Sequence, residues 1–295
     1  MVSMARVLNR EKRVQIVVAL VEGNSIRATA RMAGCSKNTV VKLLSDLGYA
    51  CAAYQDEALH DLPCKRVQAD EIWSFIAKKQ KNVRGDEEQW VGDVWTYTAI
   101  CADTKLCVSY LIGARNGSVV REFMEDVASR LENRVQLTTD GHVMYLEAVD
   151  MAFGGEIDYA MLQKIYGSDP EGQKRYSPAK STGIEVQPIS GTPDPAHINT
   201  SYVERQNLTM RMSMRCFTRL TNAFSKKIEN HAASIALHFA YYNWCRPHRS
   251  LRTEKNNRVT PAMAAGLADR PMTIEQLVDL LPETRHLGGR PTKTN

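Results

Sequence analysis

The sequence lacks the features that would take a chain into or across a membrane. No apolar run among its 295 residues is long enough to span a bilayer. The opening stretch, MVSMARVLNREKR, has no apolar core of the kind that secretion signals carry. Internal repeats and low-complexity tracts are also missing, which excludes repeat architectures. We therefore expect a cytoplasmic protein.

Cysteine is present but lacks the spacing of a metal site. The chain has seven cysteines, an odd number, and none of them forms a CxxC pair. This usage favours free thiols in a reducing compartment. A structural zinc site, which needs closely paired ligands, is disfavoured.

The composition is that of a globular protein with basic segments. Hydrophobic residues make up 43% and charged residues 24%, so the chain can bury a core. The formal net charge is +5, and Lys and Arg crowd into Arg6–Arg13, Arg205–Arg219 and Arg246–Arg258, whereas acidic residues are denser in Glu122–Glu171. Basic arms around a less basic middle suit a nucleic-acid partner.

The first fifty residues predict a compact three-helix unit. Apolar residues at helical spacing predict a helix over Arg10–Glu22. Ser25 can cap a short second helix that runs to Met32, and Ser36 can cap a third that ends at Gly48. We assign residues 1–50 to a helix-turn-helix domain and residues 51–64 to a linker.

The start of the third helix carries side chains that can contact DNA. In a helix-turn-helix this turn lies in the major groove, where Asn pairs with adenine, Lys with guanine or phosphate, and Thr with a thymine methyl. A three-helix module that binds another protein is the alternative. The candidate DNA-binding residues are Ser36, Lys37, Asn38, Thr39 and Lys42.

The middle of the chain predicts a mixed α/β sheet. Strand-like runs cover Lys65–Ala77, Val94–Ala102 and Leu106–Ile112. A capped amphipathic helix follows at Ser118–Glu132, and a short strand at Val135–Thr139. Three strands, a helix and a fourth strand open such a sheet.

The second half is predicted to be mainly helical. Helices are expected over Glu156–Tyr166, Asn199–Leu220 and Lys226–Trp244. The stretch Gly167–Pro195 is rich in Gly, Pro and Ser and predicts a long irregular excursion. The tail after Pro282 is polar, and we expect it to be loose.

Three acids are candidates for a metal centre. Asp70 lies in the first predicted strand, Asp140 ends the fourth, and Glu204 falls in the first turn of a late helix. Hard oxygen ligands suit Mg²⁺, and two such ions can assist phosphoryl transfer. Any one acid alone is more often solvated or structural, so the order of the elements supports the assignment.

The helix that carries Glu204 has two distinct faces. Glu204, Asn207, Arg211 and Arg215 share one face, which could follow a phosphate backbone. A solvated basic face is the alternative. The residues expected to pack on the sheet are Val203, Met210, Met214 and Phe217.

Two histidines stand near these elements. His142 follows Asp140 by two residues and could touch a phosphate or a metal-bound water. Arg246 and His248 lie in a basic turn broken by Pro247, where they could bind DNA or brace the end of the domain.

Several of these stretches resemble one family. TSYVERQNLTMRMSMRCFTRLTNAFSKKIENH, ADEIWSFIAKKQKN and TTDGH resemble the insertion-sequence-one type of bacterial DDE transposase, and YNWCRPHRSL with TPAMAAG resembles endings in the wider DDE group. The resemblance implies a ribonuclease H-like fold, Mg²⁺ (with Mn²⁺ as a substitute), and DNA strand cleavage and joining at element ends. It assigns catalysis to Asp70, Asp140 and Glu204, helped by Asn207 and Arg211.

These inferences give a domain plan. A ribonuclease H-like catalytic domain spans residues 65–250, with an insertion around 154–198, and residues 251–295 form a C-terminal extension. Because two element ends must be joined, we expect a homodimer or larger homo-oligomer on DNA in the bacterial nucleoid. Two alternatives stay open: a nuclease or resolvase of the same fold without strand transfer, and a transposase-derived DNA-binding regulator.

Overall fold

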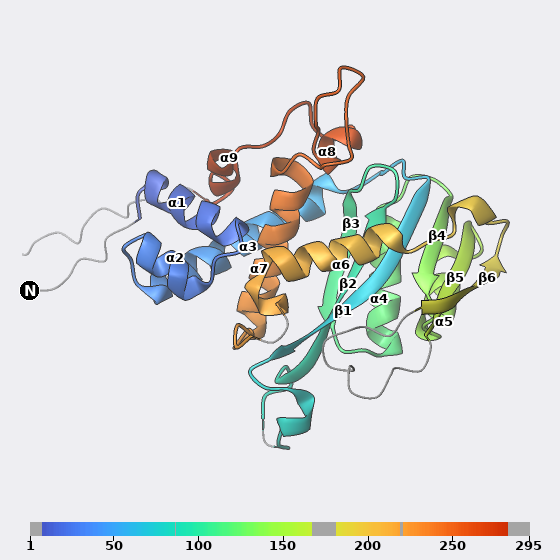
Figure 1. Ribbon diagram of the computed structural model, residues 1–295, viewed down its shortest axis with the longest axis horizontal. Coiled ribbons are helices and arrows are strands. Elements are labelled where there is room, and N and C mark those ends of the chain that lie inside the picture. The colour runs from blue at the N-terminus through green and yellow to red at the C-terminus, as the bar shows by residue number, and fades with distance from the viewer. Residues whose placement is uncertain (1–7, 86, 167–180, 219–220, 283–295) are drawn as a thin grey trace, which may run out of the picture.

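A six-stranded mixed sheet forms the centre of the molecule (Figure 1). The computed structural model describes residues 8–85, 87–166, 181–218 and 221–282. The strand order is β3-β2-β1-β4-β5-β6. The strands are β1 (Arg66–Ile76), β2 (Gly92–Cys101), β3 (Cys107–Gly113), β4 (Val135–Asp140), β5 (Ile157–Tyr166) and β6 (Ser181–Ser190).

The sheet contains both antiparallel and parallel strand pairs. β1, β2 and β3 form an antiparallel meander, whereas β4 and β5 run parallel to β1 and β6 returns antiparallel to β5. A turn at Asp103–Lys105 joins β2 to β3, with Lys105 at φ 60°. The predicted fold class, a mixed α/β sheet preceded by a helical unit, is confirmed.

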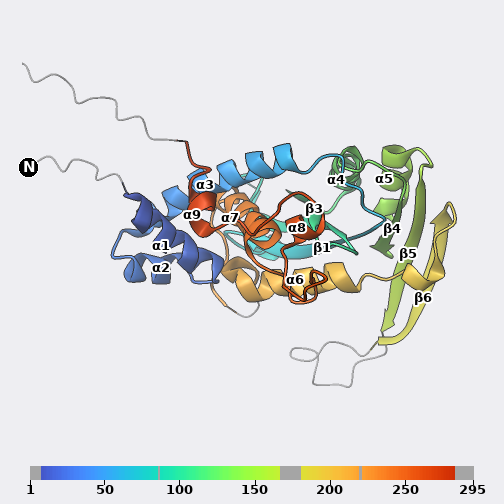
Figure 2. The same cartoon turned by 90° about the horizontal axis from the view of Figure 1, so that it is seen from above.

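Helices cover both faces of the sheet (Figure 2). Seen from above, α4 (Gly117–Ser129) and α5 (Met144–Phe153) lie on one side of the strands, and α6 (Ser201–Ser213) lies on the other. The alternation of β1 serves both layers: Ala69 packs in the core with residues of α4 and α5, whereas Ile72 packs with Met210 of α6.

The three predicted N-terminal helices are confirmed. They are α1 (Arg10–Val21), α2 (Ile26–Met32) and α3 (Lys37–Ala58), and the Ser25 and Ser36 side chains accept the capping bonds from Ala28 N and Thr39 N. Their core is shared with α7 (Ile228–Ala240) and α9 (Ile274–Val278), which contribute buried Leu237 and Leu277.

The predicted helix end at Gly48 is wrong, because α3 continues to Ala58. Gly48 is buried within the helix, where a Cβ atom would lie 2.5 Å from the Cβ of Ala233 in α7. This glycine therefore serves close helix packing and not a turn. The proposed domain boundary at residue 50 falls inside α3.

Segment 154–198 differs most from the prediction. The stretch expected to be a helix is β5, which pairs with β4, and the described part of the expected irregular excursion contains β6. The first half of β5 is buried on both faces, so its apolar residues run together and imitate a helix. Residues 167–180 lie outside the described part. The helix α5 was not predicted.

The C-terminal part returns to both layers. After α7, a π-helical turn covers Tyr241–Cys245, and α8 (Pro261–Ala264) adds Ala262 to the sheet core. α9 then reaches α1, where Arg10 Nη2 lies 2.6 Å from the Asp279 carboxylate. The tail after Pro282 lies outside the described residues. Among the residues described, no helix combines the length and the apolar character needed to cross a membrane.

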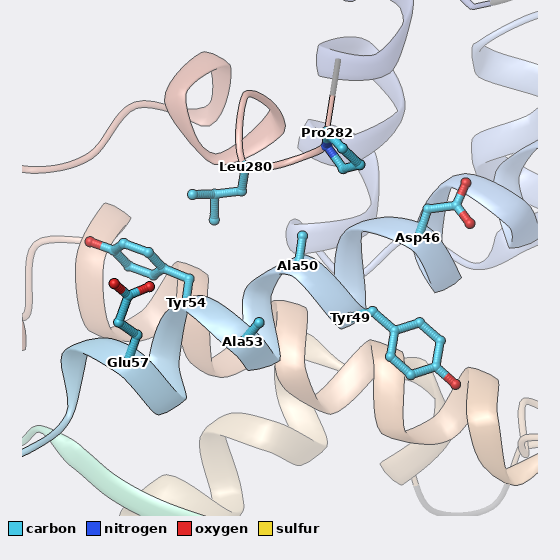
Figure 3. A pocket seen from close by; sticks show the side chains of 8 residues that line it. All are labelled: Asp46, Tyr49, Ala50, Ala53, Tyr54, Glu57, Leu280 and Pro282. Carbon is cyan, nitrogen blue, oxygen red and sulfur yellow. The ribbon is translucent and has the colours of Figure 1, made fainter. Parts of the chain in front are cut away.

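A pocket lies along the exposed side of the second half of α3 (Figure 3). Its volume is about 580 Å³, and Leu280 and Pro282 close it from the chain after α9. None of the three candidate acids lines it, so it is separate from the candidate site described below.

The close contact at Gly48 gives a test of the helix packing. Gly→Ala inside a helix normally stabilises by up to about 1 kcal/mol. We expect Gly48→Ala to destabilise the protein by about 1–3 kcal/mol in urea unfolding, because the new Cβ overlaps Ala233. Adding Ala233→Gly should recover part of the loss. Gly117→Ala, at a helix start with no neighbouring atom within 4 Å, is the control and should not destabilise.

A buried histidine predicts sensitivity to acid. His231 of α7 is held by Ser74 Oγ at 3.1 Å and by Ser225 Oγ at 2.9 Å. Burial lowers the pKa of His231 to about 4. In the unfolded chain the histidine pKa is about 6.5, so between pH 6.5 and 4 the unfolded state binds a proton at His231 and the folded state does not. This stability is present above pH 6.5 and is lost as the pH falls toward 4.

We expect urea unfolding to show that difference. Between pH 7 and pH 4.5, wild type should lose roughly 2 kcal/mol more than His231→Gln, which has no proton to gain. The substitution will also lower stability at pH 7, so the change with pH is the quantity to compare. Equal changes in the two proteins would contradict the buried neutral histidine.

Candidate metal and nucleic-acid site

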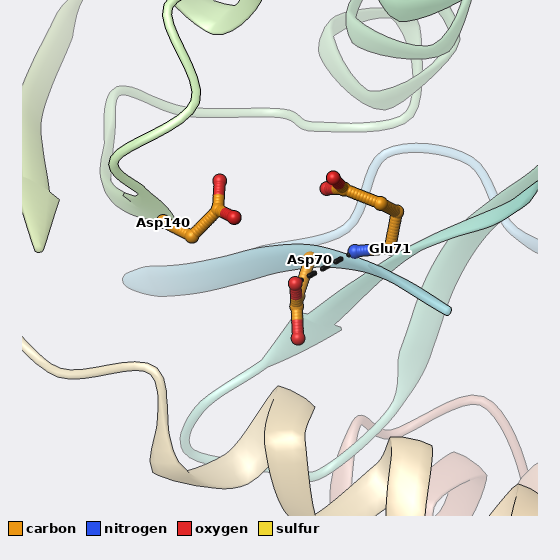
Figure 4. Close-up of side chains that lie close together, drawn as sticks. All are labelled: Asp70, Glu71 and Asp140. Atoms are coloured by element: carbon orange, nitrogen blue, oxygen red, sulfur yellow. Dashed lines mark hydrogen bonds between the residues drawn. The ribbon is translucent and has the colours of Figure 1, made fainter. Parts of the chain in front are cut away.

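Two of the three predicted acids meet at the centre of the sheet. β1 and β4 are parallel neighbours in which Ala69 pairs with Thr139, so Asp70 and Asp140 occupy the next position on each strand. Oxygen atoms of Asp70, Asp140 and Glu71 all lie within 4.8 Å of one another (Figure 4).

Asp70 is held in place from two sides. Its Oδ1 accepts from the Glu71 backbone N–H at 2.8 Å, and its Oδ2 accepts from Asn207 Nδ2 of α6 at 2.8 Å. Burial, and then the charges of Asp140, Glu71 and Glu204, raise the pKa of Asp70 to about 7, although the bond from Glu71 N–H opposes the rise. This carboxylate therefore carries its charge at a cost that a cation would relieve.

Asp140 ends β4 and begins the turn to α5. The His142 N–H donates to its Oδ1 at 3.2 Å, and burial, followed by the charge of Glu71, raises the pKa of Asp140. The His142 ring faces this turn, because its Nδ1 accepts from Met144 N–H at 3.3 Å. In this structure His142 supports the turn after Asp140.

Glu71 belongs to the acidic cluster, but its oxygens have partners. Figure 4 shows Asp70 pointing toward α6 and Glu71 pointing away from it. The Glu71 side chain is 3% exposed, and its Oε1 accepts from Arg115 Nε at 3.0 Å and Nη2 at 2.6 Å. Its Oε2 accepts from Tyr145 OH at 3.2 Å. Glu71 was not predicted as a site residue from the sequence, where its position next to Asp70 was the feature that could have indicated it.

Gln68 fixes α6 to β1. The N-cap residue of α6, Thr200, makes no side-chain capping bond. Instead, Gln68 Oε1 accepts from the backbone N–H groups of Tyr202 at 2.9 Å and Val203 at 3.2 Å, and Gln68 Nε2 donates to Asn199 Oδ1 at 2.7 Å. A β1 side chain thus satisfies two of the orphan N–H donors at the start of the helix.

The Glu204 charge acts on Asp70, but the Glu204 side chain is bound by other residues. Its charge contributes to the raised pKa of Asp70, yet it is not part of the group within 4.8 Å. Lys164 Nζ of β5 lies 2.5 Å from each Glu204 oxygen, and Thr200 Oγ1 donates to Oε1 at 2.6 Å. The sequence analysis missed Lys164 because it placed that residue on a helix.

The predicted packing face of α6 is confirmed, whereas the face predicted to follow DNA is buried at Asn207. The four residues expected to pack are all buried. Asn207 is buried too, and its Oδ1 has no hydrogen-bond partner within the described part of the chain. Arg211 is half-buried in the last turn of the helix. The placement of Arg215 on the same helical face is wrong, because α6 ends at Ser213 and Arg215 begins a 3₁₀ turn, Arg215–Phe217. The packed residues are Val203, Met210, Met214 and Phe217.

A group of basic side chains lies beside α6. The His248 ring meets Tyr242 edge-on at 6.1 Å, and Tyr242 OH donates to the Lys105 carbonyl at 2.9 Å. Burial, and then the nearby charges of Lys105, Arg246 and Arg205, lower the pKa of His248. The predicted residues Arg246 and His248 therefore lie together, near cations of the β2–β3 turn and α6.

The candidate base-reading turn is remote from the acids. Both views place the start of α3 at one end of the molecule and β4, β5 and β6 at the other (Figures 1 and 2). Ser36 and Thr39 bond to each other at 2.8 Å as part of the helix cap. Lys37 and Asn38 are exposed, and Lys42 pairs with Asp46 at 2.7 Å.

The donor set fits a divalent cation. Asp70 and Asp140 offer hard oxygen ligands, have no ion pair among the described residues, and repel each other's charge. Beside Asp70, Asn207 adds a buried carbonyl oxygen that none of the described residues hydrogen-bonds. Ions such as Mg²⁺ and Mn²⁺ prefer oxygen ligands of this kind.

Comparison with known proteins gives matches only among solved structures. No protein-family model and no curated protein matches the chain. The chain is similar to Mos1 transposase in a paired-end complex with a left transposon end, at 12% identity and TM-score 0.24 over 53% of this chain and 60% of that one.

Two further structures align over more of this chain. A piggyBac transposase synaptic complex with hairpin DNA shares 11% identity at TM-score 0.43, over 95% of this chain and 73% of that one. The intasome of simian T-cell lymphotropic virus shares 14% identity at TM-score 0.39, over 90% and 77%. The chain thus spans about 60% of the length of the Mos1 chain that it matches.

The raised pKa of Asp70 predicts an unusual effect of neutralising it. The folded protein binds the Asp70 proton up to about pH 7, whereas an unfolded Asp releases it near pH 4. Stability from this group is therefore present below pH 4 and is lost as the pH rises through 7. At pH 8 we expect Asp70→Asn to raise the free energy of unfolding by roughly 1–4 kcal/mol in metal-free buffer.

The same variant tests the metal site. Adding Mg²⁺ should stabilise wild type through binding and leave Asp70→Asn unchanged. The exposed Asp269→Asn is the control, and it should behave like wild type in both measurements. An Asp70→Asn protein that is no more stable at pH 8, or that gains as much from Mg²⁺, would argue against a charge-crowded metal site.

Proposed function

We propose that the chain is a DDE-type DNA transposase that binds element ends and catalyses metal-dependent cleavage and joining of DNA strands. The observation that carries this proposal is the meeting of Asp70 and Asp140 on adjacent parallel strands, with α6 fixed to the same strand by Gln68. The order of the three acids along the chain, and the resemblance around Glu204, support the insertion-sequence-one type.

The proposed catalytic and metal-binding residues are Asp70, Asp140 and Glu204. Mg²⁺, or Mn²⁺ in its place, would supply activation of the attacking oxygen and stabilisation of the leaving oxygen when bound. Asn207 sets the orientation of the Asp70 carboxylate through its bond to Oδ2. Gln68 sets the position of the first turn of α6 and hence of Glu204.

DNA would be held at two places. The helix-turn-helix proposed for residues 1–50 offers Lys37 and Asn38 for base contacts, because both are exposed at the start of α3. Basic residues near α6 would contact phosphates on the catalytic side. The full set of proposed DNA-binding residues is Ser36, Lys37, Asn38, Thr39, Lys42, Asn207, Arg211, Arg215, Arg246 and His248.

The proposal extends to assembly and setting. Cutting and joining two element ends calls for a homodimer or a larger homo-oligomer. The resemblance supports a protein that acts on DNA in the cytoplasm of a bacterium. The catalytic domain is proposed for residues 65–250, with residues 251–295 as a C-terminal extension.

A strand-transfer assay tests the function. Wild type with Mg²⁺ and a labelled end oligonucleotide should give cleaved and joined products. Asp70→Asn, Asp140→Asn and Glu204→Gln should each lower both products by at least about a thousandfold, because each removes a metal ligand. Binding of the end DNA should stay close to wild type, because most of the proposed DNA contacts lie elsewhere.

The pattern of products separates the alternatives. Asp269→Asn is the matched control, and it should retain full activity. Cleavage without joining would support a nuclease of the same fold, and sequence-specific binding without cleavage would support a DNA-binding regulator. Substantial cleavage by one acid variant would remove that residue from the metal site.

A further inference from the structure

Lys164 stands beside the acids because β5 is longer than β4. The two strands are parallel, and Asp140, the last residue of β4, pairs with Leu162. Lys164 lies two residues further along β5 and so shares a face with Leu162. Its Nζ lies 2.5 Å from both oxygens of Glu204. The overhang of β5 thus places a cation on the third acid.

The ion pair can be exchanged. The side chains are 30% exposed for Lys164 and 40% exposed for Glu204. A pair that solvent reaches contributes little net stability, because water and salt screen it. Solvent ions can therefore reach Glu204 without unfolding of the core.

The charges around the site leave two carboxylates, Asp70 and Asp140, available to a divalent ion. Arg115 neutralises Glu71, and Lys164 neutralises Glu204. Asp70 and Asp140 keep two negative charges that no ion pair balances among the described residues. A divalent ion would balance that pair, and Glu204 could then join it only after leaving Lys164.

We propose that Lys164 is an exchangeable partner of the third acid: it holds Glu204 in the metal-free protein, gives it up when a divalent ion binds, and then contacts a DNA phosphate. The inference rests on the proposed function and adds to it a positioning residue and a phosphate contact. A phosphate is the expected new partner because the freed Lys164 ammonium lies at the same end of the parallel strands as the acids.

Titration with Mn²⁺ alone, in the absence of DNA, tests the exchange. In isothermal calorimetry, Lys164→Gln should bind Mn²⁺ roughly two- to fivefold more tightly than wild type, because no ion pair has to be broken. Lys164→Arg keeps the pair and should bind as wild type does. Lys78→Gln removes an equal charge and another Lys–Glu pair, with Glu87, in the connection between β1 and β2, and should change nothing.

A double-mutant cycle separates exchange from simple charge. In the Glu204→Gln background, Lys164→Gln should no longer alter Mn²⁺ affinity, because the competing pair is already lost. A gain that persists in that background would show a long-range charge effect and overturn the proposal. Unchanged or weaker Mn²⁺ binding by Lys164→Gln alone would overturn it as well.

The phosphate contact has its own test. Binding of a duplex oligonucleotide is measured against salt concentration, with and without Ca²⁺. With Ca²⁺, Lys164→Gln should flatten the dependence by about 0.9 in slope, one phosphate contact. Without it, the slope should equal that of wild type, because Lys164 is still held by Glu204. If Lys164→Gln and wild type have equal slopes with Ca²⁺ as well as without it, the phosphate contact is wrong.

Failure of the inference can be told from failure of the proposed function. If wild type binds Mn²⁺ and Asp70→Asn does not, the metal site stands whatever Lys164 does. If no form of the protein binds Mn²⁺, both the metal site and the exchange are wrong.

Discussion

The site depends on one side chain that ties a helix to a strand. Gln68 of β1 accepts from the second and third backbone N–H groups of α6, those of Tyr202 and Val203, and the N-cap side chain of the helix makes no capping bond. Asp70 lies two residues further along the same strand, on the same face, and is bound by Asn207 one turn after Glu204. A single strand face therefore fixes both the first acid and the helix that carries the third.

The acid on the other face of β1, Glu71, has its own cation partner. Glu71 points away from α6 and is neutralised by Arg115, whose guanidinium also stacks on Trp95 at 4.7 Å. The Tyr145 hydroxyl of α5 donates a hydrogen bond to the other Glu71 oxygen, Oε2. Strand alternation thus puts side by side one acid with an ion-pair partner, Glu71, and one acid with hydrogen bonds but no ion pair among the described residues, Asp70. The pKa of Asp70 is raised to about 7.

Local patterns predicted the parts of the fold that local forces decide. Strands β1 to β4, α4 and the capped N-terminal helices follow from alternation, helical spacing and capping residues near in sequence. The errors arose where distant contacts decide the outcome. Gly48 resembles a helix end until Ala233 is placed against it, and β5 resembles a helix because both its faces are buried. For the site, the sequence predicted Asp70 and Asp140 together, but Lys164 reaches Glu204 only through the overhang of β5.

The overhang and the docked helix together explain how this fold tolerates its crowded acids. Two carboxylates are each neutralised by a cation from a different element, Arg115 before α4 and Lys164 on β5, so among the described acids of this site Asp70 and Asp140 are the two without an ion pair. Holding two partly buried carboxylates close together without a cation is costly, and here the two lie where β1 pairs with β4 and Asn207 of α6 reaches Asp70. The pairing of β1 with β4 and the bond from Asn207 of α6 hold these two carboxylates in place. Their negative charge can be relieved by protonation or by a cation from solution, and this makes the position suited to binding a metal.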